Sequence, residues 1–78
     1  MTTPEERLAE LGLSVPEVAA PVAAYVPAAR TGNLVYTSGQ LPMVDGAMVE
    51  TGKVGAEVGP GRAKELAAIC AINALAAV

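Results

Sequence analysis

The sequence predicts a small α+β domain in which antiparallel hairpins lie between a short N-terminal helix and a long C-terminal helix. Two observations predict this class. Short runs of sheet-forming residues alternate with Gly-containing turns over residues 23–50, and residues 60–78 are rich in Ala, Leu and Ile without an internal break. A chain of 78 residues makes at most one small domain.

Residues 1–22 predict a helix followed by a connector. Thr3 can serve as the N-cap, Pro4 fits the first helical position, and Glu6 completes a capping box three residues after the cap. Gly12 is expected to end the helix. Pro16 and Pro21 then disfavour helix in the residues before them, so the connector should be extended and lie along the surface.

Residues 23–50 predict strands and hairpins. We expect one strand over residues 25–30, a turn at residues 31–33 and a returning strand over residues 34–38. Asp45-Gly46 predicts a second reversal. The strand at residues 34–38 is apolar on both faces, with Tyr36 expected in the core, so it needs cover from a helix on one side and from another subunit on the other.

Residues 60–78 predict a long helix that begins near Pro60 with an exposed first turn containing Arg62, Lys64 and Glu65. Cys70 is expected to be a buried structural thiol, and Asn73 is expected to bond a neighbouring loop or backbone. No Gly, Pro or basic residue marks an end to this helix, which predicts the N-terminal part of a longer domain. The Gly-rich connection at residues 52–61 lacks the spacing of a phosphate-binding loop.

Composition excludes several function classes. The chain has no histidine and a single cysteine, Cys70, so it offers neither a usual metal site nor an internal disulfide. Its net charge is −3 and it has no run of Lys or Arg, which makes nucleic-acid binding an unexpected role. No stretch approaches the roughly 20 apolar residues of a membrane span. A cytoplasmic setting is therefore expected.

The candidate site is formed by Tyr25, Ser38, Gly39 and Gln40. The first hairpin should bring Tyr25 close to Ser38, and the Gly39 backbone is unshielded by a side chain. A hydroxyl, a phenol and a free backbone N–H at one sheet edge could hold a small carboxylate or carbonyl. The alternative on residue chemistry alone is an ordinary strand end followed by turn residues.

The segment "GNLVYTSGQLP", residues 32–42, resembles the signature of the RidA/YjgF family of reactive intermediate deaminases. The matching residues include Gly32, Asn33, Leu34 and the block from Ser38 to Pro42. Tyr25 also stands at the spacing of the family's substrate-pocket tyrosine, and the helix containing Asn73 resembles the family's first long helix. The resemblance extends from about residue 25 to residue 78, and the Ser-Gly-Gln block is its most specific part.

The resemblance implies a chorismate-mutase-like α+β fold, of which this chain would be the N-terminal half. It also implies a homotrimer with pockets in the clefts between subunits. The implied activity is hydrolysis of enamines and imines, such as 2-aminoacrylate and 2-iminopropanoate, to 2-oxo acids and ammonia, without metal or cofactor. Tyr25 and Ser38 would then be catalytic, while Gly39 and Gln40 would bind substrate.

Two alternatives stay open. The first is the endoribonuclease or translation-inhibitor activity attributed to some family members, and the second is a trimeric protein that binds a small molecule without turnover. The family's carboxylate-binding arginine and water-positioning glutamate belong to its C-terminal half, so the resemblance implies that this chain carries half a site. Ala23-Ala24 and Pro27 depart from the family pattern and leave the preferred substrate open.

Overall fold

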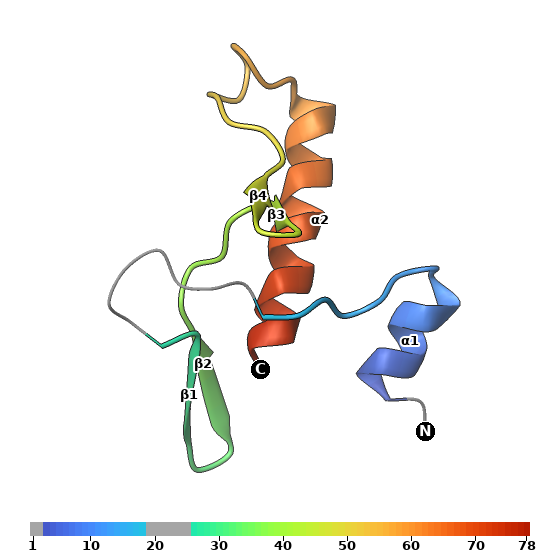
Figure 1. The fold of residues 1–78 in the computed structure, drawn as a ribbon, viewed down its shortest axis with the longest axis vertical. Helices are drawn as coiled ribbons and strands as arrows, with labels where there is room; N and C mark the ends of the chain where they lie inside the picture. The colour runs from blue at the N-terminus through green and yellow to red at the C-terminus, as the bar shows by residue number, and fades with distance from the viewer. Residues whose placement is uncertain (1–2, 19–25) are drawn as a thin grey trace.

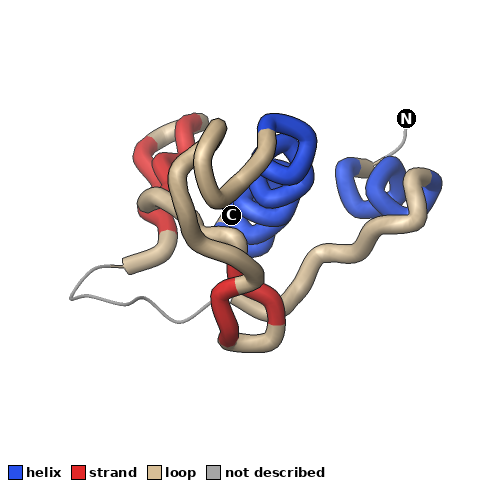
Figure 2. The backbone as a smooth tube through the Cα atoms, turned by 90° about the horizontal axis from the view of Figure 1, so that it is seen from above, coloured by secondary structure: helices blue, strands red, loops and turns tan. Residues whose placement is uncertain are grey.

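The computed structural model describes residues 3–18 and 26–78. Along the chain it contains helix α1 (Pro4–Glu10), strands β1 (Ala28–Thr31), β2 (Leu34–Thr37), β3 (Met43–Val44) and β4 (Ala47–Met48), and helix α2 (Pro60–Ala77). This is an α+β arrangement, as the sequence predicts. The β3–β4 hairpin lies beside the middle of α2, while α1 lies apart from the other elements (Figures 1 and 2).

Helix α1 begins as its sequence predicts. The backbone N–H of Glu6 donates to the side-chain oxygen of Thr3 over 3.2 Å, and Pro4 occupies the first turn. Gly12 follows the helix at φ +77°, a conformation that glycine adopts without strain. The connector at residues 13–18 is exposed, as expected of a surface segment.

The strands form two separate two-stranded antiparallel sheets, β1–β2 and β3–β4. Both turns have two residues. Gly32 opens the first turn at φ +58°, and the second uses Asp45 at φ 52° and Gly46 at φ 81°. Positive φ at both central residues is what a type I′ hairpin requires, and this explains the Asp-Gly pair.

The predicted bounds of the first hairpin were wrong by a few residues. β1 begins at Ala28 rather than at residue 25, and Thr31 belongs to the strand rather than to the turn. Pro27, directly before β1, has no N–H to donate to a ladder. Ser38 lies one residue beyond the end of β2.

The prediction that Tyr36 lies in the core is also wrong, because its side chain is 60% exposed. Leu34 and Val35 are exposed as well, so neither face of β2 is covered. Cys70, expected to be buried, is only half-buried. The radius of gyration is 13.9 Å, against about 11.5 Å for a compact domain of this length. Burial is therefore limited, and this leaves both faces of the hairpin open.

The core of the described residues is small and centres on α2. Its most buried members are Val58 at 3%, Leu66 at 8% and Asn73 at 4% exposure. Helix α2 starts after Gly59, with Pro60 in its first turn, and Arg62 bonds Glu65 one turn on over 2.7 Å. Neither helix is long and apolar enough to span a membrane in the part of the chain described.

The first turn of α2 is also tied to the segment that follows β4. Arg62 Nε donates to the carboxylate of Glu50 over 2.9 Å, and the two carboxylates of Glu50 and Glu65 raise the pKa of the arginine. The sequence correctly predicts an exposed first turn, but it does not reveal the partner twelve residues earlier. The ion pair therefore fixes where the loop after β4 meets the helix.

A compact loop over residues 52–58 leads from β4 toward α2. The N–H of Lys53 donates to the Glu57 carboxylate over 3.0 Å, and Gly55 donates to the carbonyl of Val58 over 2.8 Å. The Lys53 and Glu57 backbone N–H groups lower the pKa of the Glu57 carboxyl below its ordinary value of 4.5. The loop thus uses a carboxylate to satisfy its own backbone.

This loop should respond to acid. Because the folded-state pKa of Glu57 is lowered, its stabilising bonds are fully present above pH 4.5 and are lost as the pH falls through the lowered value. We expect the amide signal of Lys53 to titrate with a midpoint below pH 4.5, read by NMR. The variant Glu57→Gln should abolish that titration. A midpoint at or above 4.5 would contradict the proposed bond.

Candidate functional site

Ser38 is fixed where the β1–β2 ladder ends. Its backbone N–H donates to the carbonyl oxygen of Pro27 over 3.0 Å, and its Oγ donates to the same oxygen over 3.3 Å. The two bonds extend the strand pairing one step beyond Ala28 and Thr37. Since backbone and side chain converge on one acceptor, the half-buried Ser38 hydroxyl has a defined position.

Gln40 holds the other side of this hydroxyl. Its Nε2 donates to Ser38 Oγ over 3.4 Å, a long hydrogen bond between two half-buried groups. A serine hydroxyl has one proton and two lone pairs. The proton is directed to Pro27 and one lone pair to Gln40, so one lone pair of Ser38 is left to accept a hydrogen bond from a water or a ligand.

Gly39, between these two residues, is exposed. Its φ does not lie in the left-handed region, and a Cβ added to it would meet nothing within 4 Å. Neither backbone conformation nor packing among the described residues therefore requires a glycine here. The consequence of glycine at this position is an unshielded main chain beside the Ser38 hydroxyl.

The chain after Gln40 is anchored to α2 by Asn73. The side-chain amide of Asn73 donates to the carbonyl of Leu41 over 2.9 Å and to the carbonyl of Met43 over 3.0 Å. This confirms the expectation that Asn73 bonds a neighbouring loop or backbone. The three residues 38–40 are thus held at one end by Pro27 and at the other by the helix.

The structure brings Ser38, Gly39 and Gln40 together, but their roles in catalysis or binding stay predictions. Tyr25, the fourth predicted site residue, lies outside the described residues. Sequence reasoning missed the part played by Pro27, whose carbonyl orients Ser38. The signal was available, because a two-residue turn at Gly32 and Asn33 places Pro27 opposite Ser38 in the hairpin register.

Within the part of the chain that the structure describes, no charged side chain bonds the side chains of residues 38–40. Arg30 is exposed, and its Nε donates to the carbonyl of Gly32 over 3.0 Å. Within residues 3–18 and 26–78, no group of three or more potential metal ligands comes together. The chemistry that residues 38–40 can provide is therefore hydrogen bonding from a hydroxyl, an amide and an open backbone.

Comparisons with known proteins agree on a family. The chain matches the family described as "YjgF/chorismate mutase-like, putative endoribonuclease" over residues 5–78. A comparison with curated proteins found no match.

The solved structures that are similar to the chain include two bacterial proteins. One is a "putative endoribonuclease" from Shewanella oneidensis, with 36% identity and a TM-score of 0.90 over 97% of this chain and 50% of that one. The other is a protein of unknown function from Agrobacterium tumefaciens, with 46% identity and a TM-score of 0.75 over 92% of this chain and 41% of that one. The chain thus spans about half the length of the first structure and somewhat less of the second. With the family matched over nearly the whole sequence, this chain belongs to the YjgF/chorismate mutase-like family.

Proposed function

We propose that this chain contributes one side of a site for the hydrolytic deamination of small enamines and imines, of the 2-aminoacrylate and 2-iminopropanoate type. The observation that carries the proposal is the open Gly39 backbone directly beside a Ser38 hydroxyl with one free lone pair. Membership in the family supports it. The activity of the whole domain is part of the proposal, because the chain spans about half of its solved neighbours.

In the proposed reaction, water adds to the carbon of the C=N bond, and the resulting carbinolamine releases ammonia to give the 2-oxo acid. Ser38 Oγ would accept a hydrogen bond from the attacking water or from the imine N–H. The Gly39 backbone would face the polar end of the substrate, and Gln40 would keep the hydroxyl in place. Catalysis of this kind depends mainly on positioning and on stabilisation of developing charge.

The test combines Ser38→Ala with Tyr25→Phe and measures hydrolysis of 2-iminopropanoate generated in situ by an amino-acid oxidase. We expect the rate to fall by about a hundredfold, the size seen when a positioned hydrogen-bonding group is lost from an active site. Thr37→Val is the matched control, since it removes the neighbouring exposed hydroxyl but keeps the branched shape. An unchanged rate in the double variant would remove both residues from the mechanism.

A second candidate is endoribonuclease activity, favoured because the family and the similar Shewanella protein are both described as putative endoribonucleases. The net charge of −3 counts against it, and Arg62 is already engaged by two carboxylates. Salt-dependent RNA binding together with RNA cleavage would favour this candidate. Binding of an imino acid without release of ammonia would instead favour a non-catalytic binding protein.

We also propose a homotrimer with the pocket in a cleft between subunits, as the family resemblance implies. The open faces of β2 support this, because Leu34 is 58% and Tyr36 60% exposed. Large apolar side chains gathered on an exposed hairpin are typical of interaction surfaces. Native mass spectrometry of the purified protein tests the assembly, and a monomer at assay concentration would contradict it.

A further inference from the structure

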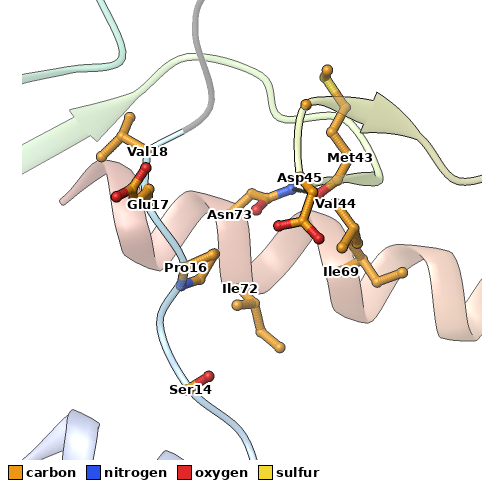
Figure 3. Close-up of a pocket in the computed structure, with 11 residues that line it drawn as sticks. Ser14, Pro16, Glu17, Val18, Met43, Val44, Asp45, Ile69, Ile72 and Asn73 are labelled. Carbon is orange, nitrogen blue, oxygen red and sulfur yellow. Dashed lines mark hydrogen bonds between the residues drawn. The ribbon is translucent and has the colours of Figure 1, made fainter.

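A cavity of about 700 Å³ is lined in part by Asn73 (Figure 3). Three segments form it: the connector after α1, the β3–β4 hairpin and the face of α2 that includes Ile69 and Ile72. Its walls are largely apolar. Cavities of this size with apolar walls and a few polar groups are usual for small-molecule sites.

The polar groups directed into this cavity act mainly as hydrogen-bond acceptors. Asn73 is 4% exposed, and both N–H groups of its amide are directed at the Leu41 and Met43 carbonyls. Its Oδ1 is therefore turned away from the hairpin, as Figure 3 shows, and no residue that the structure describes donates to it. This oxygen is accessible, since no side-chain oxygen or nitrogen among the described residues is both fully buried and without a hydrogen-bond partner, and it can therefore accept a hydrogen bond from a donor in the cavity.

Two carboxylates add negative charge to the walls of the cavity, one on each side of Asn73 (Figure 3). Asp45, in the β3–β4 turn, and Glu17, on the connector, both line the cavity. Neither forms an ion pair within residues 3–18 and 26–78, and the described lining contains no Lys or Arg. Ser14 is the one hydroxyl in that lining. The cavity is therefore acidic and lacks a cation of its own.

We propose that this cavity binds a small primary alkylammonium ion. The ammonium group has three donors and no acceptor, which complements the Asn73 oxygen and the carboxylates of Asp45 and Glu17. The alkyl chain would lie against Ile69 and Ile72. An anionic imino acid would be repelled by the same carboxylates, so this site is separate from the proposed deaminase site at residues 38–40 and does not depend on it.

The test is an NMR titration of the protein with n-hexylammonium chloride. We expect saturable shifts confined to the amides of Asp45 and Gly46 and to the side-chain NH₂ signals of Asn73. Hexanol, with the same chain and no charge, should bind about fivefold more weakly or less, which is the contribution of a partly exposed ion pair. Hexanoate should produce no saturable shift.

Variants of the two carboxylates test whether their charges contribute to the binding of n-hexylammonium. Glu17→Gln with Asp45→Asn should weaken n-hexylammonium binding by about fivefold. Asn is the residue best suited to a type I′ turn, so Asp45→Asn keeps the hairpin. If the double variant does not fold, Glu17→Gln alone replaces it in the test, because Glu17 lies on the exposed connector. Glu5→Gln removes a charge outside the cavity lining and should leave the affinity within about twofold.

Three results would overturn the proposal. The first is the absence of any saturable shift with n-hexylammonium. The second is an affinity for hexanol equal to that for n-hexylammonium, which would mean that the cavity binds alkyl chains whether or not they carry a positive charge. The third is a loss of affinity in Glu5→Gln as large as in the double variant, which would assign the effect to net charge.

Discussion

Asn73→Asp should lower the free energy of unfolding by about 3 kcal/mol. The substitution keeps the size of the side chain but removes both donors to the Leu41 and Met43 carbonyls, and it places a carboxylate where 4% of the residue is exposed. Leaving buried acceptors unpaired costs about 1–3 kcal/mol, and burying a charge adds to that. For 78 residues the total stability is only about 4–12 kcal/mol.

Urea denaturation followed by circular dichroism measures this loss. Asn33→Asp is the matched control, because it makes the same chemical change in the exposed turn of the first hairpin. It should alter the free energy of unfolding by less than about 0.5 kcal/mol. Equal denaturation midpoints for the two variants would show that Asn73 does not tie α2 to the hairpin.

Gly52→Ala should destabilise the protein by about 2–3 kcal/mol. Gly52 has φ +144°, which side chains rarely tolerate, and an added Cβ would lie 2.7 Å from Glu57 Cβ and 3.1 Å from Val58 Cγ2. Backbone strain of this kind costs about 1–3 kcal/mol. Val58 is 3% exposed, so it has little room to move away.

Gly61→Ala is the control for this variant. Gly61 lies in the first turn of α2, its φ is not positive, and an added Cβ would meet nothing within 4 Å. Alanine there should be neutral or should stabilise by about 0.5–1 kcal/mol, because it favours helix and restricts the unfolded chain. Thermal unfolding of both variants gives the comparison. A Gly52→Ala protein as stable as Gly61→Ala would contradict the close packing of the loop.

The local elements could be predicted because their causes lie in adjacent residues. Thr3 caps α1 and Asp45-Gly46 closes a hairpin through dihedral preferences that a few residues determine. The start of β1 was missed because Pro27 interrupts a run that otherwise favours strand. Exposure of Tyr36 could not be predicted, since burial depends on what packs against a strand rather than on its alternation.

In the candidate site too, the local features could be predicted from the sequence, while those that depend on strand register and packing could not. The block from Ser38 to Gln40 is visible in the sequence, and so is the hairpin that carries it. The convergence of the Ser38 N–H and Oγ on one carbonyl follows only when the register pairs Ser38 with Pro27. The cavity beneath the second hairpin was not predictable, because it arises where the connector passes α2, far along the sequence from Asn73.

The bond from Asn73 to Leu41 spans 32 positions, whereas each hairpin closes through two residues. Contacts of short separation form within microseconds, and those that close long loops come late in folding. Docking of α2 onto the segment after β2 should therefore follow the rate-limiting barrier. In stopped-flow experiments, the loss of stability in Asn73→Asp would then be seen as faster unfolding, with the refolding rate nearly unchanged. The tie between helix and hairpin would thus control how long the folded state lasts more than how quickly it forms.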